Sequence, residues 1–315
     1  MCGIAGLIYR DGTHEIGRDL TRMLQSMKHR GPDSTGYALY GPRGHRILMR
    51  YTLADANTPR DFEFGDRLRR HQAQVLERLR GLGATVHDVE AETEYAYRIE
   101  LELPAANGGE PDLKAIADRL EDIPDCEVLS LGHSLEIVKD LGDAETVSDQ
   151  YELKGFTGTH AIGHVRMATE SDVDISGAHP YWAYPFSDVA VVHNGQLTNY
   201  FQWKRRLERS GHRFQSECDS EIIAVYLAEK MSGGASLEDA MRDSLEELDG
   251  VFTYIAVTDD ALGVAKDEMA AKPLVLYESD DVVALASEEI AIRAVLDREI
   301  ETYDPYESEV LVWQR

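Results

Sequence analysis

The sequence predicts an α+β protein in which layered sheets are flanked by helices, with a smaller α+β unit inserted between about residues 45 and 150. Three observations predict this arrangement. Strand patterns open the chain, helical patterns follow residue 155, and a run of strand patterns closes the chain. Between residues 45 and 150 the pattern changes to a separate alternation of helices and strands. At 315 residues the chain can bury a sizeable core.

The first elements follow from apolar runs and the residues that break them. Residues 3–9 are apolar and predict a buried strand, and an Asp11-Gly12 turn separates it from a helix over 18–28. Gly31-Pro32-Asp33 ends that helical pattern, and a strand resumes over 36–40.

The insert has its own helices and strands. A helix is predicted by apolar residues at helical spacing, namely Leu68, Val75, Leu79 and Leu82. A strand over 95–103, a loop at 107–109, a helix over 113–120 and strands over 128–131 and 135–138 complete it. This alternation favours a small subdomain of ferredoxin-like type.

The second half of the chain returns to the main pattern after residue 155. We expect helices over 220–230, 237–248 and near 290–296, and Ser236 is a suitable N-cap for the second. We expect strands over 189–192, 252–257, 274–277, 282–285 and 310–313.

The charge of the chain is strongly acidic. The 58 acidic residues exceed the 32 basic ones and give a net charge of −26. Such a surface repels phosphate backbones and anionic lipids, which argues against nucleic-acid binding and membrane binding. We interpret the acidity as adaptation to high intracellular salt, where screening removes self-repulsion; the alternative is a protein that is merely acidic.

The cysteines and the first residues suggest a cytoplasmic protein. Cys2, Cys126 and Cys218 form no CxxC pair and no disulfide framework. The apolar opening is short and lacks a basic leader, so it predicts neither a signal peptide nor a membrane span. The chain has no glycine-rich phosphate loop and its histidines lack metal-ligand spacing, so we predict no cofactor and no metal.

Cys2 is the first candidate for chemistry. Because Cys2 and Gly3 are both small, removal of Met1 is expected, and this would place a thiol and a free α-amine on one residue. An α-amine titrates near pH 8, so it can accept the thiol proton and later return it to a leaving group. Taken alone, Cys2 is better interpreted as a small apolar residue of an N-terminal strand, because free cysteines often pack as hydrophobic residues.

Five ordered motifs change that balance. They are MCGIAG at residues 1–6, HRGPDS at 29–34, GHVRMAT at 163–169, HNG at 193–195 and DSE at 219–221. Together they resemble the class II glutamine amidotransferases, whose nucleophile is an N-terminal cysteine. The resemblance covers about residues 1–42 and 155–315 and implies a single amidotransferase domain over 1–315, interrupted by the insert. It also implies a four-layer αββα N-terminal-nucleophile hydrolase sandwich.

The resemblance implies the main roles in the hydrolysis of L-glutamine. Arg166 offers a planar pair of donors for the substrate carboxylate, and Asp219 offers a carboxylate for its ammonium group. Asn194 and the backbone N–H of Gly195 would hold the oxyanion that forms when Cys2 attacks. The alternatives are a structural ion pair for Arg166 and a plain turn for Asn194-Gly195, whereas a helix N-cap at Asp219 would be compatible with its binding role.

Other motif residues have supporting roles by the same resemblance. Arg30 and Asp33 belong to a segment that shapes the pocket floor and holds the terminal strand. Thr169 contributes to the substrate loop after Arg166, and His193 is a structural neighbour of Asn194. Met167 and Glu170 depart from the better-known members, which leaves the contacts of this loop open.

The acceptor of the ammonia is suggested by finer details. Residues 159–171 and 178–181 look like the stand-alone amidotransferase subunits of split glutamate synthases and N-methylglutamate synthases. That resemblance implies a flavin-dependent synthase subunit as partner, and we expect no synthase module fused to this chain. A homo-oligomer and a docking role for the insert are left open.

Two other functions remain to be separated from this one. A regulatory subunit that senses glutamine without turnover would need only Arg166 and Asp219. An N-terminal-nucleophile hydrolase of other amides would use Cys2 but would not need that pair.

Overall fold

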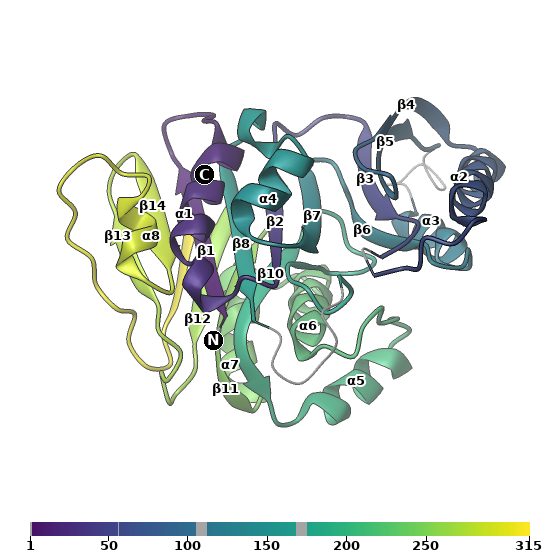
Figure 1. The fold of residues 1–315 in the computed structure, drawn as a ribbon. Helices are drawn as coiled ribbons and strands as arrows, with labels where there is room; N and C mark the ends of the chain where they lie inside the picture. The colour runs from purple at the N-terminus through teal and green to yellow at the C-terminus, as the bar shows by residue number, and fades with distance from the viewer. Residues whose placement is uncertain (1, 56, 105–111, 168–174) are drawn as a thin grey trace.

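The computed structural model describes residues 2–55, 57–104, 112–167 and 175–315, and its core is a pair of stacked sheets (Figure 1). The first sheet has six strands in the order β13-β14-β1-β8-β2-β7, and each strand is antiparallel to its neighbours. The strands are β1 (Gly3–Tyr9), β2 (Ser34–Tyr40), β7 (Leu135–Leu141), β8 (His160–Arg166), β13 (Val275–Glu278) and β14 (Val282–Ala286). Because β1 lies inside the sheet between two others, its apolar run is buried on both faces.

The second sheet packs against the first. Its order is β15-β12-β11-β10-β9, and β10 and β11 contact β1 and β8 across the interface. Its strands are β9 (Tyr181–Trp182), β10 (Ala190–Leu197), β11 (Gly250–Val257), β12 (Ala261–Lys266) and β15 (Val310–Gln314). The core between the sheets joins residues of both, such as Ile162, Val192, Ile255 and Leu262.

Helices cover the two outer faces. On the first sheet lie α1 (Ile16–Ser26), α4 (Ala144–Gln150) and α8 (Glu289–Arg293), and the second carries α6 (Asp219–Ser232) and α7 (Leu237–Glu247), with α5 (Tyr200–Arg209) packed on α6 (Figure 1). Short 3-10 turns are η1 (Lys28–Arg30) and η3 (Leu153–Gly155). The predicted αββα order of four layers is therefore confirmed. Within the described residues, no helix combines the length and the apolar character that a membrane span requires.

The insert forms a third sheet with two helices, at the right of Figure 1. In chain order it consists of β3 (Ile47–Thr52), α2 (Phe64–Gly81), β4 (Thr85–Ala91), β5 (Ala96–Glu102), α3 (Leu113–Leu120) and β6 (Glu127–Gly132). The βαββαβ connection and the strand order β4-β5-β3-β6 are those of the ferredoxin-like type. The strand predicted over 135–138 is β7, which pairs with β2 in the first sheet. The separate sheet thus lies within residues 47–132.

Most predicted elements are observed, and several observed elements were not predicted. Ser236 caps α7 by accepting the N–H of Asp239, as expected. The patterns did not reveal β3, β4, β8, β9, β12, α4 or α5. In β8, polar His160, His164 and Arg166 interrupt the apolar pattern, although the strand is almost entirely buried. Burial by neighbouring layers, rather than local alternation, makes this segment a strand.

Candidate active site

One cavity of about 620 Å³ collects most of the predicted site residues. It opens where Cys2 just before β1, the end of β8, the middle of β10 and the start of α6 meet. Among its lining residues are Cys2, Arg166, His193, Asn194, Gly195 and Asp219. Segments more than 150 residues apart in the sequence therefore supply one site, because β1 and β8 are paired and β10 packs across them.

The backbone of the nucleophile candidate is fixed from two sides. The carbonyl oxygen of Cys2 accepts a hydrogen bond from Nε of Arg30 at 3.0 Å and from Nδ2 of Asn194 at 3.3 Å. The guanidinium of Arg30 is in turn held by Glu288 at 2.6 Å. Burial opposes ionisation of Glu288, but the hydrogen bonds from Arg30 and His29 outweigh it and lower its pKa. Glu288 was not predicted, because nothing in its local sequence links it to Arg30.

The backbone at Gly195 admits no side chain. Its φ is +149°, and a Cβ atom would lie 2.2 Å from the carbonyl oxygen of Val251 and 2.6 Å from Cα of Phe252. Both neighbours are backbone atoms of β11, which pairs with β10 here. Gly195 and Asn194 lie inside β10, so the plain hairpin-turn interpretation of Asn-Gly is wrong. Both residues line the cavity together with Cys2.

The same cavity is also lined by Arg166 and Asp219. Arg166 is the last residue of β8 and Asp219 the first of α6. Oδ2 of Asp219 accepts the N–H of Leu197 at 2.8 Å, and Oδ1 lies 3.6 Å from Nδ1 of His193. Burial opposes ionisation, but the His193 and Leu197 contacts prevail and lower the pKa of Asp219. The N-cap residue of α6 is Cys218, so the N-cap interpretation of Asp219 is wrong.

Neutral histidines lie behind this carboxylate. Burial lowers the pKa of His164 to about 3 and holds that of His179 well below its usual range. Nδ1 of His179 accepts the backbone N–H of His193 at 3.3 Å, so its Nε2 carries the hydrogen that it donates to Ser220 Oγ at 3.0 Å. The Ser220 hydroxyl lies 2.9 Å from Nδ1 of His193. These hydrogen bonds orient His193 next to Asp219, and the neutral His164 and His179 add no charge there.

Two of the remaining predicted residues, Arg30 and Asp33, are not part of the cavity lining. Asp33 lies behind Arg166, and its backbone N–H donates to the Arg166 carbonyl at 3.1 Å. Arg30 donates a hydrogen bond to the carbonyl oxygen of Cys2, as described above. Thr169 and Glu170 lie outside the described residues, so their contacts stay predictions. Among the residues that are described, no three His, Cys, Asp or Glu side chains are grouped as metal ligands would be.

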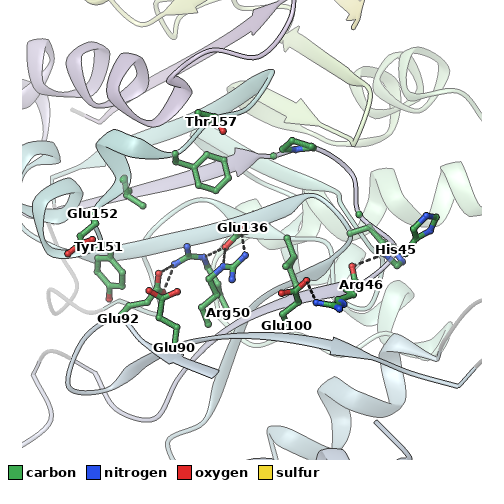
Figure 2. A pocket seen from close by; sticks show the side chains of 18 of the residues that line it. His45, Arg46, Arg50, Glu90, Glu92, Glu100, Glu136, Tyr151, Glu152 and Thr157 are labelled. Carbon is green, nitrogen blue, oxygen red and sulfur yellow. Dashed lines mark hydrogen bonds and ion pairs between the residues drawn. The ribbon is translucent and has the colours of Figure 1, made fainter. Parts of the chain in front are cut away.

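A larger cavity of about 800 Å³ lies between the insert and the sandwich (Figure 2). Figure 2 shows Arg50 of β3 between Glu92 and Glu136, and Arg98 also bonds Glu136 at 2.7 Å. Burial raises the pKa of Glu92, whereas at Glu136 the two guanidinium groups overcome burial and lower the pKa. None of the predicted site residues that the structure describes lines this cavity. The charged side chains of this cavity form ion pairs with one another, and these ion pairs join the insert to β7 of the sandwich.

Comparison with known proteins gives relatives along the whole chain. Residues 164–294 match a family model described as a glutamine amidotransferase domain. A protein of Methanothermobacter thermautotrophicus named "Putative glutamine amidotransferase" is 40% identical, covering 98% of this chain and 99% of its own. The "Glutamine amidotransferase-like protein GlxB" of Rhizobium meliloti is 35% identical, covering 99% and 98% respectively.

A solved structure supports the fold. Glutamine phosphoribosylpyrophosphate amidotransferase from B. subtilis, complexed with ADP and GMP, matches with a TM-score of 0.60 and 21% sequence identity. The match covers 99% of this chain and 47% of that chain, so this chain spans about half the length of that protein. At this identity the likeness shows the fold alone, and it agrees with the four layers described above.

Proposed function

Because this chain belongs to the class II glutamine amidotransferases, we propose that Cys2 hydrolyses L-glutamine to L-glutamate and ammonia through a thioester. The observation that carries the proposal is the convergence of Cys2, Asn194-Gly195, Arg166 and Asp219 on one cavity. Each group suits a different part of the same substrate. Arg166 would hold the α-carboxylate of glutamine and Asp219 its α-ammonium group, and the side-chain amide would reach Cys2.

The first chemical step is attack of the Cys2 sulfur on the amide carbon. With Met1 removed, the α-amine of Cys2 takes the thiol proton, the C–S bond forms, and the carbonyl oxygen becomes an oxyanion. Nδ2 of Asn194 and the N–H of Gly195 would stabilise that charge. The ionised Asp219 is suited to hold the substrate ammonium, since its pKa is lowered.

The second step releases ammonia and then glutamate. The tetrahedral intermediate collapses with cleavage of the C–N bond, and the α-ammonium of Cys2 returns its proton to the leaving nitrogen. Water activated by the same amine then attacks the thioester carbon, the C–S bond breaks, and the thiol is regenerated. One residue thereby serves as nucleophile, base and acid.

We infer further that the ammonia passes to a separate flavin-dependent synthase subunit of the glutamate synthase type, in the cytoplasm. The support is the resemblance of residues 159–171 and 178–181 to stand-alone amidotransferase subunits. The insert, which is held rigidly to the sandwich by the Arg50 and Glu136 ion pair, is suited to contact such a partner. The co-purification described below tests this coupling.

The two other functions fit the cavity less well. A sensor of glutamine would need the groups for the amino acid end but no nucleophile beside oxyanion donors. A hydrolase of other amides would not need Arg166 and Asp219 in the same cavity as Cys2.

Labelling of Cys2 tests the proposed reaction. The glutamine analogue 6-diazo-5-oxo-norleucine should alkylate Cys2 alone and abolish release of glutamate, and Cys2→Ala should lose turnover while keeping its thermal midpoint. Cys218→Ala is the matched control, because this thiol lines the same cavity but burial, followed by the charge of Asp219, raises its pKa. Labelling of Cys218 instead of Cys2, or full turnover by protein whose N-terminal residue is still Met1, would refute the mechanism.

A further inference from the structure

Ser287 connects the strand of the nucleophile to the candidate oxyanion donor. It follows β14 directly and is 3% exposed. Its Oγ accepts the backbone N–H of Ile4 at 3.0 Å and Nδ2 of Asn194 at 3.3 Å. Its own N–H donates to the carbonyl of Ile4 at 2.9 Å. One buried hydroxyl therefore contacts both β1, two residues after Cys2, and the side chain of Asn194 on β10.

The carboxamide of Asn194 has a defined orientation. Its NH2 end is directed at two acceptors, the carbonyl of Cys2 at 3.3 Å and Oγ of Ser287 at 3.3 Å. Its Oδ1 atom is buried and has no hydrogen bond within the described part of the chain. If the amide were turned around, Oδ1 would face the Cys2 carbonyl oxygen, which can only accept. The two acceptors thus hold the NH2 end beside the nucleophile.

Both of these hydrogen bonds are long. An N–H···O bond in a protein is usually about 2.7–3.2 Å, so bonds of 3.3 Å are weak. A charged oxygen close to the NH2 group would form a shorter and stronger bond than either neutral acceptor. The two acceptors therefore orient the NH2 group but bind it weakly, so that it remains able to donate to an oxyanion.

We propose that Ser287 is a positioning residue that orients the Asn194 carboxamide for stabilisation of the oxyanion. The inference rests on the proposed function, because it needs Asn194 to act as an oxyanion donor. It names a residue outside every motif of the resemblance. The competing explanation is purely structural, with Ser287 serving only to satisfy the N–H of Ile4.

A double-mutant cycle separates the two explanations. If Ser287 acts through Asn194, Ser287→Ala should lower kcat for glutamine about tenfold, a part of the roughly 10²–10³-fold that loss of an oxyanion donor costs. KM should stay within about twofold, because Arg166 and Asp219 are untouched. In the Asn194→Ala background the same change should have no further effect on kcat. Ser287→Thr, which keeps the hydroxyl, should recover most of the rate.

Ser244→Ala is the matched control for loss of a buried hydroxyl. Ser244 is fully buried and bonds the Met241 carbonyl at 2.7 Å and the Tyr254 hydroxyl at 2.5 Å, on the far side of the second sheet. It should lower the thermal midpoint and leave kcat unchanged. Should Ser287→Ala be too unstable to assay, Ser287→Cys, a weaker hydrogen-bonding group of similar shape, provides the same cycle.

The outcomes divide clearly. An unchanged kcat in Ser287→Ala, or an equal loss in the wild-type and Asn194→Ala backgrounds, would overturn the positioning role while the glutaminase function stands. If the wild-type protein neither hydrolyses glutamine nor is labelled at Cys2, the proposed function itself fails. A loss of kcat confined to the background that retains Asn194 supports the inference.

Discussion

Gly195→Ala should separate the formation of the oxyanion site from the binding of glutamine. A Cβ at this position would lie 2.2 Å from the Val251 carbonyl oxygen, whereas ordinary contact begins at 3.4 Å. Relief of this clash requires β10 and β11 to separate locally by roughly 1 Å, since the two nearest atoms that the Cβ would meet are backbone atoms of β11. A displacement of that size at a reacting group costs on the order of 10²-fold in rate, and the moved N–H is itself the proposed donor. We therefore expect kcat to fall about 10²–10³-fold with a small change in KM.

The measurement is steady-state release of glutamate over a range of glutamine concentrations, with a thermal melt of each variant. Gly12→Ala is the control, because Gly12 has a similar φ of +140° but nothing within 4 Å of its Cβ position. It reproduces the backbone strain of a side chain at positive φ without the clash. If Gly195→Ala keeps kcat near that of Gly12→Ala while remaining folded, the backbone donor at Gly195 is not needed and the reasoning is refuted.

Two further predictions concern the insert and the partner. Glu136→Gln should lower the free energy of unfolding by about 3 kcal/mol, because Arg50 and Arg98 lose a buried carboxylate. The measurement is urea unfolding, with Glu238→Gln in an exposed ion pair as the control. Equal urea midpoints of the two variants would contradict the prediction. Isolation of the native protein at high salt should yield a complex with a yellow, flavin-containing subunit, identified by absorbance and mass spectrometry. Recovery of this chain only, with no flavoprotein under any salt condition, would count against the synthase coupling.

The fold was predictable wherever local chemistry and tertiary packing agree. The apolar run of β1 and the Ser236 cap of α7 are local signals, and both predicted their elements. The first helix of the insert was predicted from Leu68, Val75 and Leu79, which are buried on one face of α2. A short apolar run, however, does not state which strand it will pair with. This explains why β7 was expected in the insert although it extends the first sheet beside β2.

The motif residues of the site were predictable for a different reason. The proposed reaction requires particular side chains, which we assign to Cys2, Arg166, Asn194 and Asp219, and the order of the motifs points to them without any knowledge of the fold. Their arrangement in one cavity follows only from the pairing of β1 with β8 and the stacking of β10 on both. The sequence therefore predicted the groups, while the sheets determine the distances between them.

The residues that were missed lie where the first and last parts of the chain meet. β1 is an interior strand, so it pairs with β8 on one side and with β14 on the other. The pairing with β14 delivers Ser287 to the N–H of Ile4 and to Asn194, and Glu288 to the guanidinium that holds the Cys2 carbonyl. A serine and a glutamate are ordinary at the end of a strand, so their local sequence contains no signal of this role. A chain end tends to fray, and the placement of β1 between β8 and β14 holds the backbone next to Cys2 in the way that the proposed attack on a fixed amide requires.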